Sequence, residues 1–216
     1  MKRLLLDTNI YGLLAADRTF HSIHQALQQQ KNDIHVYGFS LIRKELKAAP
    51  KVLIDGVNVR ASLLRAYDSV IVKEYSLSGE YKRIAEEYYS AYLLCGGRLP
   101  QEVLFNDFLI VACASKHEIP IVVSEDNATL VSELTKKAYD LVNTKRSLPC
   151  PRFIGYTRFK ESILGARFSD PVINNSNKLW ILLCFFYILQ WTLFLSFCCH
   201  KHSKESLIYK SYVGIS

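Results

Sequence analysis

Four carboxylates are the side chains of this sequence best placed to do chemistry: Asp7, Glu45, Asp107 and Asp126. Asp7 follows a run of three leucines, and Asp126 follows the apolar run that ends at Ser124. Ligands of parallel α/β sheets bind beyond the carboxyl ends of the strands, so these two acids are expected at one edge of a sheet. We expect Asp107 in the first turn of the helix before the second strand, and Glu45 on another helix.

Gathering several carboxylates in one place is costly, because like charges repel and raise each other's pKa. A divalent cation removes that cost and favours the ionised carboxylates. All-oxygen ligands suit Mg²⁺ or Mn²⁺. Such ions polarise a phosphodiester and generate hydroxide from bound water, so the pattern indicates metal-assisted hydrolysis.

Each acid also has a simpler interpretation when it is taken alone. Asp7 suits a helix cap, and Asp107 suits a helix N-terminus, where it would complement the dipole. Asp126 lies in a turn sequence in which aspartate is common, and Glu45 lies in a charged stretch that is typical of a solvated helix face. The metal-site hypothesis therefore depends on the four acids being brought together.

Apolar runs that alternate with amphipathic stretches predict an α/β domain with a mostly parallel central sheet. Strands are expected at 3–6, 33–39, 119–123 and 152–156. Helices are expected at 10–30, 40–48, 58–74, 79–95, 106–117, 130–142 and 159–164. The acids then follow strands or lie on the neighbouring helices.

Four segments together resemble the PIN-domain nucleases, which include the VapC-type toxins. They are L-L-L-D-T-N ending at Asn9, R-K-E-L around Glu45, N-D-F-L-I-V-A-C-A-S-K from Asn106, and I-V-V-S-E-D ending at Asp126. The resemblance covers residues 2–165 and implies a three-layer α/β/α fold. It implies a Mg²⁺- or Mn²⁺-dependent endoribonuclease, and its likeness to the VapC-type toxins extends this expectation to a toxin-like role.

The resemblance also assigns roles to individual residues. It makes the four acids the catalytic, metal-binding quartet, and it makes Thr8, Asn9 and Ser124 the polar residues that support them. Glu125 stands beside Asp126, so the sequence leaves open which acid of that turn reaches the metal.

The chain carries a net charge of +7 and has a pI of about 9.0, which favours an anionic partner such as RNA or a membrane surface. Arg43, Lys44 and Lys47 flank Glu45 and are candidates for phosphate contacts. Their other interpretation is a solvated helix face. A homodimer is an open expectation, and an antitoxin partner is unknown.

The chain divides into a PIN-like domain at 1–165, a polar linker at 166–178, an apolar segment at 179–199 and a short basic tail at 200–216. The uncharged segment 179–199 has the length of a membrane-spanning helix. A buried core helix and an appendage without a role are the alternatives. We expect the nuclease domain in the cytoplasm, either free or anchored to a membrane by this segment.

Two functions other than a nuclease fit parts of the sequence. One is a non-catalytic RNA- or protein-binding module that keeps the fold without turnover. The other is a membrane-anchored structural protein defined by its apolar segment. The four acids separate them, because a binding module has no need to keep costly acids together.

Overall fold

A computed structural model describes residues 1–54 and 56–165 of the chain. The linker, the apolar segment 179–199 and the basic tail lie outside the described residues. Among the helices that are described, none has both the length and the apolar character that a bilayer crossing requires.

A five-stranded parallel sheet forms the centre of the described domain, in the order β5-β2-β1-β6-β7. Its strands are β1 (Lys2–Leu6), β2 (Ile34–Phe39), β5 (Ile71–Tyr75), β6 (Ile121–Val123) and β7 (Arg152–Ile154). β1 lies in the middle, where Leu4 is opposite Val36 on one side and Ile121 on the other. Leu4, Leu5 and Leu6 are almost completely buried, as a central strand covered on both faces requires.

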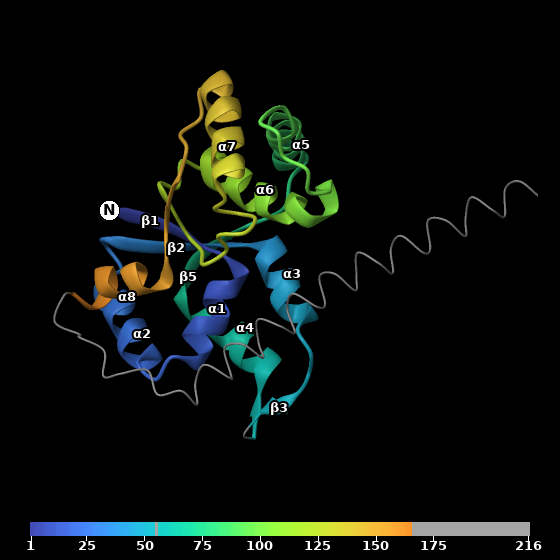
Figure 1. Ribbon diagram of the computed structural model, residues 1–216. Coiled ribbons are helices and arrows are strands. Elements are labelled where there is room, and N and C mark those ends of the chain that lie inside the picture. Colours follow the sequence, from blue (N-terminus) through green and yellow to red (C-terminus); the bar gives the residue numbers. More distant parts are fainter. Residues whose placement is uncertain (55, 166–216) are drawn as a thin grey trace, which may run out of the picture.

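Helices cover both faces of this sheet (Figure 1). On one face lie α5 (Gly79–Leu94), α6 (Gln101–Lys116) and α7 (Glu133–Arg146), which pack on one another. On the other face lie α1 (Thr8–Ala16), α2 (Phe20–Gln29), α3 (Ser40–Ala48), α4 (Val59–Val70) and α8 (Tyr156–Leu164). The three-layer α/β/α fold with a parallel sheet is therefore confirmed.

The helix expected at 10–30 is two helices, α1 and α2, because Asp17 ends the first one. The Asp17 carboxylate accepts hydrogen bonds from the backbone and hydroxyl of Thr19, both at 2.7 Å. It also accepts a hydrogen bond from Tyr156 at 2.7 Å and pairs with Lys160 at 3.1 Å. The break thus fastens the first two helices to α8.

The helix expected at 58–74 ends at Val70, and the residues after it form the edge strand β5. Ile71 and Val72 are β-branched, and β2 offers an open edge for parallel pairing. A short hairpin precedes α4, formed by β3 (Leu53–Ile54) and β4 (Val57–Asn58). The sequence did not suggest this hairpin.

The expectation that Asp107 lies in a first helical turn is wrong, because α6 begins five residues earlier than expected, at Gln101. Pro100 stands before its first residue, where the missing N–H costs nothing. Asp107 therefore lies inside the helix, and the helical backbone, not a capping interaction, sets the direction of its side chain.

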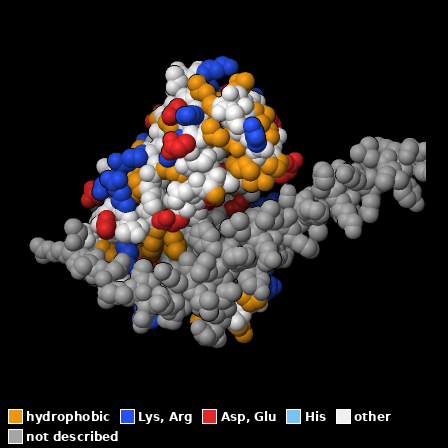
Figure 2. All heavy atoms as spheres, in the orientation of Figure 1, with side chains coloured by type: hydrophobic (Ala, Val, Ile, Leu, Met, Phe, Trp, Pro, Cys, Tyr) orange, Lys and Arg blue, Asp and Glu red, His pale blue; other side chains and the backbone are white. Residues whose placement is uncertain are grey.

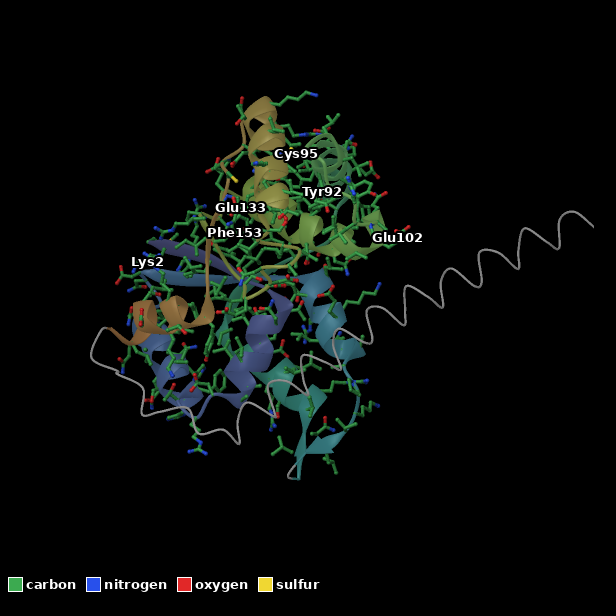
Figure 3. All side chains as sticks on the ribbon, viewed as in Figure 1. Lys2, Tyr92, Cys95, Glu102, Glu133 and Phe153 are labelled. Carbon is green, nitrogen blue, oxygen red and sulfur yellow. The ribbon has the colours of Figure 1, made fainter. Side chains whose placement is uncertain are left out.

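The turn between α5 and α6 is closed by Tyr92, which is labelled in Figure 3. Its hydroxyl accepts hydrogen bonds from the backbone of Arg98 and Leu99, both at 3.3 Å. A Cβ on Gly97 would lie 2.2 Å from the tyrosine ring, so only glycine allows this approach. The turn fixes where α6 begins and therefore where Asp107 lies on it.

Apolar side chains remain exposed around this turn, and Figure 2 shows hydrophobic side chains on the same part of the surface. Leu94 at the end of α5 is 87% exposed, and Val103 near the start of α6 is 40% exposed. This corner therefore presents apolar surface that the core does not use.

Gly38 in β2 provides a test of how tightly Tyr67 packs against this strand. A Cβ there would lie 2.4 Å from the hydroxyl of Tyr67, which donates to Glu74 at 2.8 Å and lies 3.2 Å from the Phe39 carbonyl oxygen. Gly38→Ala should lower the free energy of unfolding by about 1–3 kcal/mol, because the buried tyrosine must move. Urea unfolding of the full chain measures this change.

Gly12→Ala is the matched control, since nothing lies within 4 Å of a Cβ at this position in α1. It should leave the stability unchanged or raise it by up to about 1 kcal/mol, because alanine favours the helix. Equal effects of the two substitutions would contradict the packing described for Gly38.

Candidate active site

Asp7 lies at the end of β1, where it caps α1 and accepts several hydrogen bonds. Its Oδ1 accepts from the backbone of Thr8 at 2.6 Å. Its Oδ2 accepts from Asn9 at 2.7 Å and from the hydroxyl of Ser124 at 2.7 Å. Asp7 is 6% exposed, so these bonds replace almost all of its contact with water. The cap and the site interpretation are thus compatible.

Glu45 on α3 is connected to the elements that carry two of the other acids. Its Oε2 accepts from the hydroxyl of Thr8, next to Asp7. Its Oε1 accepts from the side-chain amide of Asn106 at 2.6 Å, next to Asp107. Glu45 is therefore turned toward the sheet edge, although its helix carries solvent-exposed lysines.

Asp107 and Asp126 are joined by the hydroxyl of Thr129. Thr129 Oγ1 lies 2.5 Å from Asp107 Oδ2 and 2.6 Å from Asp126 Oδ2. A hydroxyl carries a single proton, so Thr129 donates to one of the two carboxylates at a time. Ser124 completes the connection, because its Oγ accepts from the backbone of Asp126 at 3.0 Å while donating to Asp7.

The electrostatics of the site reflect this convergence. Burial raises the pKa of Asp7 to about 6, and the negative charge of Asp126 adds to the rise. Burial raises the pKa of Glu45 to about 7, with a further contribution from Asp7. Burial and then the charges of Asp7, Asp126 and Glu45 raise the pKa of Asp107 well above its usual range. Asp7, Glu45 and Asp107 therefore each lie close enough to another acid of the cluster to be affected by its charge.

The carboxylate of Glu125 has its hydrogen-bond partner outside this cluster. Its Oε1 accepts a hydrogen bond from the backbone of Tyr156 at the start of α8. A Cβ on the preceding Gly155 would lie 2.7 Å from the same oxygen, so glycine makes room for the carboxylate. The structure thus joins Asp126, and not its neighbour, to Asp107.

The three basic residues of α3 differ in their surroundings. Arg43 pairs with Asp68 at 3.0 Å, and its guanidinium lies 5.9 Å from the centre of the Tyr67 ring. Lys44 and Lys47 are exposed. The two lysines are therefore better placed for a phosphate than Arg43 is.

Asn106 and Thr129 belong to the site but were not singled out in the sequence. Asn106 directly precedes Asp107, and Thr129 stands three residues after Asp126. Polar residues are common in turns such as the one that holds Thr129, and Asn106 is one polar residue within a helix, so their types alone gave no signal.

Within residues 1–54 and 56–165, no group of three or more His, Cys, Asp or Glu side chains is arranged to hold a metal ion as it stands. The donor set nevertheless suits a hard divalent cation, because it consists of carboxylate oxygens whose charges repel one another. Asp107 Oδ1 accepts no hydrogen bond from the described residues, whereas Oδ2 is held by Thr129. The fully buried hydroxyl of Tyr11 also has no partner among them, and its pKa is raised by burial and by Asp7.

No protein-family model matches this chain, and no curated protein matches its sequence. Among solved structures, it is similar to a chain of VapBC2 from Rickettsia felis, solved bound to a DNA fragment from their promoter. The TM-score is 0.46 and the sequence identity is 17%, over 71% of this chain and 98% of that chain. The roles of individual residues therefore depend on the geometry of the site.

The raised pKa of Asp7 gives a prediction for the metal-free protein. A carboxyl with a raised folded-state pKa stabilises the fold at low pH, and this stability is lost as the pH rises from about 4 to about 6. Asp7→Asn should therefore raise the free energy of unfolding in EDTA by about 1–3 kcal/mol at pH 7, and by much less at pH 4. Urea unfolding across this pH range measures the difference.

Glu86→Gln serves as the control, because it changes an exposed acid of α5 outside the cluster. It should leave the stability nearly unchanged at every pH. A gain from Asp7→Asn that does not vary between pH 4 and pH 7 would contradict the electrostatic account of the site.

Proposed function

We propose that this protein is a PIN-type, divalent-metal-dependent endoribonuclease. The observation that carries the proposal is the convergence of Asp7, Glu45, Asp107 and Asp126, which come from four separate segments of the chain. Hydrogen bonds through Thr8, Asn106, Ser124 and Thr129 connect them. A fold that merely needed polar residues at this edge would be more stable with neutral ones.

RNA is the substrate class that we propose. The net charge of +7 favours an anionic partner, and Lys44 and Lys47 lie exposed on the helix that carries Glu45. The resemblance to PIN-domain nucleases points to RNA and to products with 5′-phosphate and 3′-hydroxyl ends. A toxin-like role, a homodimer and an antitoxin partner remain parts of this proposal that follow from the resemblance alone.

The proposed roles follow from the surroundings of each acid. Asp7, Asp107 and Asp126 would hold one or two Mg²⁺ or Mn²⁺ ions, and Glu45 would bind an ion or orient the attacking water. Divalent ions held there would supply Lewis-acid chemistry, which activates water and stabilises charge on the phosphate oxygens. Asn9 and Ser124 orient Asp7, while Thr8 orients Glu45.

Replacing Asp107 tests the proposed activity directly. Asp107→Asn should reduce Mn²⁺-dependent cleavage of labelled RNA by at least about 100-fold, because a ligand that acts in the transition state is lost. EDTA should abolish the cleavage by the parent protein. The full chain should remain folded in the variant, since repulsion among the acids is relieved.

Glu86→Gln is again the control and should cleave RNA like the parent. Cleavage by Asp107→Asn at the rate of the parent would refute the catalytic assignment. Binding of RNA by the parent without any metal-dependent cleavage would instead favour the non-catalytic binding module.

The exposed lysines of α3 are tested through the salt dependence of RNA binding. Lys44→Ala combined with Lys47→Ala should reduce the slope of log affinity against log salt by about 1.4, as expected for the loss of two contacts to single-stranded phosphates. Binding measured in EDTA from 50 to 300 mM salt gives this slope.

Lys137→Ala with Lys145→Ala removes the same charge from exposed positions on α7 and is the matched control. It should change the slope much less. Equal slopes for the two double variants would show that α3 makes no specific phosphate contacts.

A further inference from the structure

Thr129 has two connections to the carboxylates that the proposed nuclease mechanism does not use. Its hydroxyl lies between Asp107 Oδ2 and Asp126 Oδ2, at 2.5 and 2.6 Å. Its backbone N–H donates to the other oxygen of Asp126, Oδ1, at 2.8 Å. Thr129 therefore fixes both oxygens of Asp126 and one oxygen of Asp107.

The two oxygens of the Asp107 carboxylate differ in their hydrogen bonding. Asp107 Oδ1 accepts no hydrogen bond from the described residues, while Oδ2 is held by the threonine hydroxyl. Because one oxygen is held, rotation of the carboxylate about its last bond is restricted. The free oxygen thus keeps a defined direction, which a carboxylate on a half-buried helix surface would otherwise lack.

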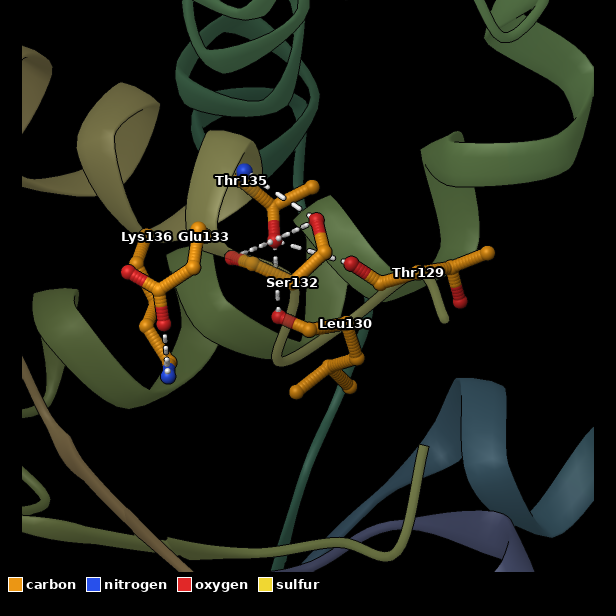
Figure 4. Close-up of polar contacts among 6 residues, drawn as sticks. All are labelled: Thr129, Leu130, Ser132, Glu133, Thr135 and Lys136. Atoms are coloured by element: carbon orange, nitrogen blue, oxygen red, sulfur yellow. Dashed lines mark hydrogen bonds and ion pairs between the residues drawn. The ribbon is translucent and has the colours of Figure 1, made fainter. Parts of the chain in front are cut away.

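The turn that carries Thr129 is itself fastened to the beginning of α7 (Figure 4). Thr135 is completely buried, and its hydroxyl lies 2.8 Å from the carbonyl oxygen of Thr129 and 2.9 Å from that of Ser132. The carbonyl oxygen of Leu130 also accepts from the hydroxyl of Tyr139, at 3.1 Å. The position of Thr129 is therefore set by a helix and not by a free loop.

We propose that Thr129 is a positioning residue, whose hydroxyl sets the relative orientation of Asp107 and Asp126 for binding a divalent cation. The proposal rests on the proposed nuclease function and names a residue that acts through the metal-binding acids. Groups that orient metal ligands typically change metal affinity by about 10- to 100-fold when they are removed. The role belongs to the hydroxyl, because the backbone contacts of Thr129 do not depend on its side chain.

Two substitutions separate the hydroxyl from the rest of the side chain. Thr129→Val keeps the shape and loses the hydroxyl, whereas Thr129→Ser keeps the hydroxyl and loses a methyl group. Thr144→Val, at an exposed position on α7, is the control for a threonine-to-valine change.

Binding of Mn²⁺ to the full chain, followed by electron paramagnetic resonance of the free ion, provides a readout that does not depend on cleavage. Thr129→Val should weaken Mn²⁺ binding by about 10-fold or more, while Thr129→Ser and Thr144→Val stay within about twofold of the parent. The rise in melting temperature on adding Mn²⁺ should follow the same order. In EDTA the valine variant should melt close to the parent.

A folded valine variant that binds Mn²⁺ as tightly as the parent would overturn the role of Thr129, and so would a serine variant as weak as valine. If valine lowers the melting temperature in EDTA, Thr129→Ala decides, because it removes the hydroxyl without burying a new methyl group. A parent that binds no Mn²⁺ would refute the nuclease proposal, and this assignment with it. A parent that binds Mn²⁺ but cuts no RNA, with a weakened valine variant, supports Thr129 and refutes only the nuclease.

Discussion

Repulsion among the carboxylates at the carboxyl edge of the sheet is the constraint on which the arrangement of this domain depends. Burial and neighbouring charges raise the pKa of Asp7, Glu45 and Asp107 together. A folded chain loses stability by holding such groups ionised. The rest of the structure must therefore supply both the rigidity that keeps them together and the polar partners that make this tolerable.

A parallel sheet supplies the rigidity, because its middle strands end side by side. β1 is paired on both sides and buries all three of its leucines, so the residue that follows it has little freedom. Neutral donors supply the polar partners. Ser124, Thr8, Asn106 and Thr129 connect the four acids through hydrogen bonds that add no further negative charge.

The parts of this arrangement that follow local rules could be predicted from the sequence. Asp7 follows an apolar strand, and an α/β domain with a mostly parallel sheet follows from alternating strands and helices, while the three-layer arrangement came from the resemblance to PIN domains. β5 could not be predicted, because Ile71 and Val72 continue a helical pattern and become a strand only beside the open edge of β2. Asn106 contacts Glu45, which lies 61 positions earlier in the chain, and Thr129 contacts Asp107, which lies 22 positions earlier. No local sequence pattern indicates contacts over such separations.

Two adjacent acids in one turn show how the fold limits repulsion among the carboxylates of the site. Glu125 and Asp126 are neighbours, yet only Asp126 joins the cluster. The carboxylate of Glu125 instead lies at the N-terminus of α8, where backbone N–H groups and the helix dipole favour a negative charge. Gly155 leaves the space for it, since a Cβ there would lie 2.7 Å from its Oε1. A fifth charge is thus kept out of the site by a contact that also begins the last described helix, so the assignment of Asp126 depends on α8 as much as on the turn itself.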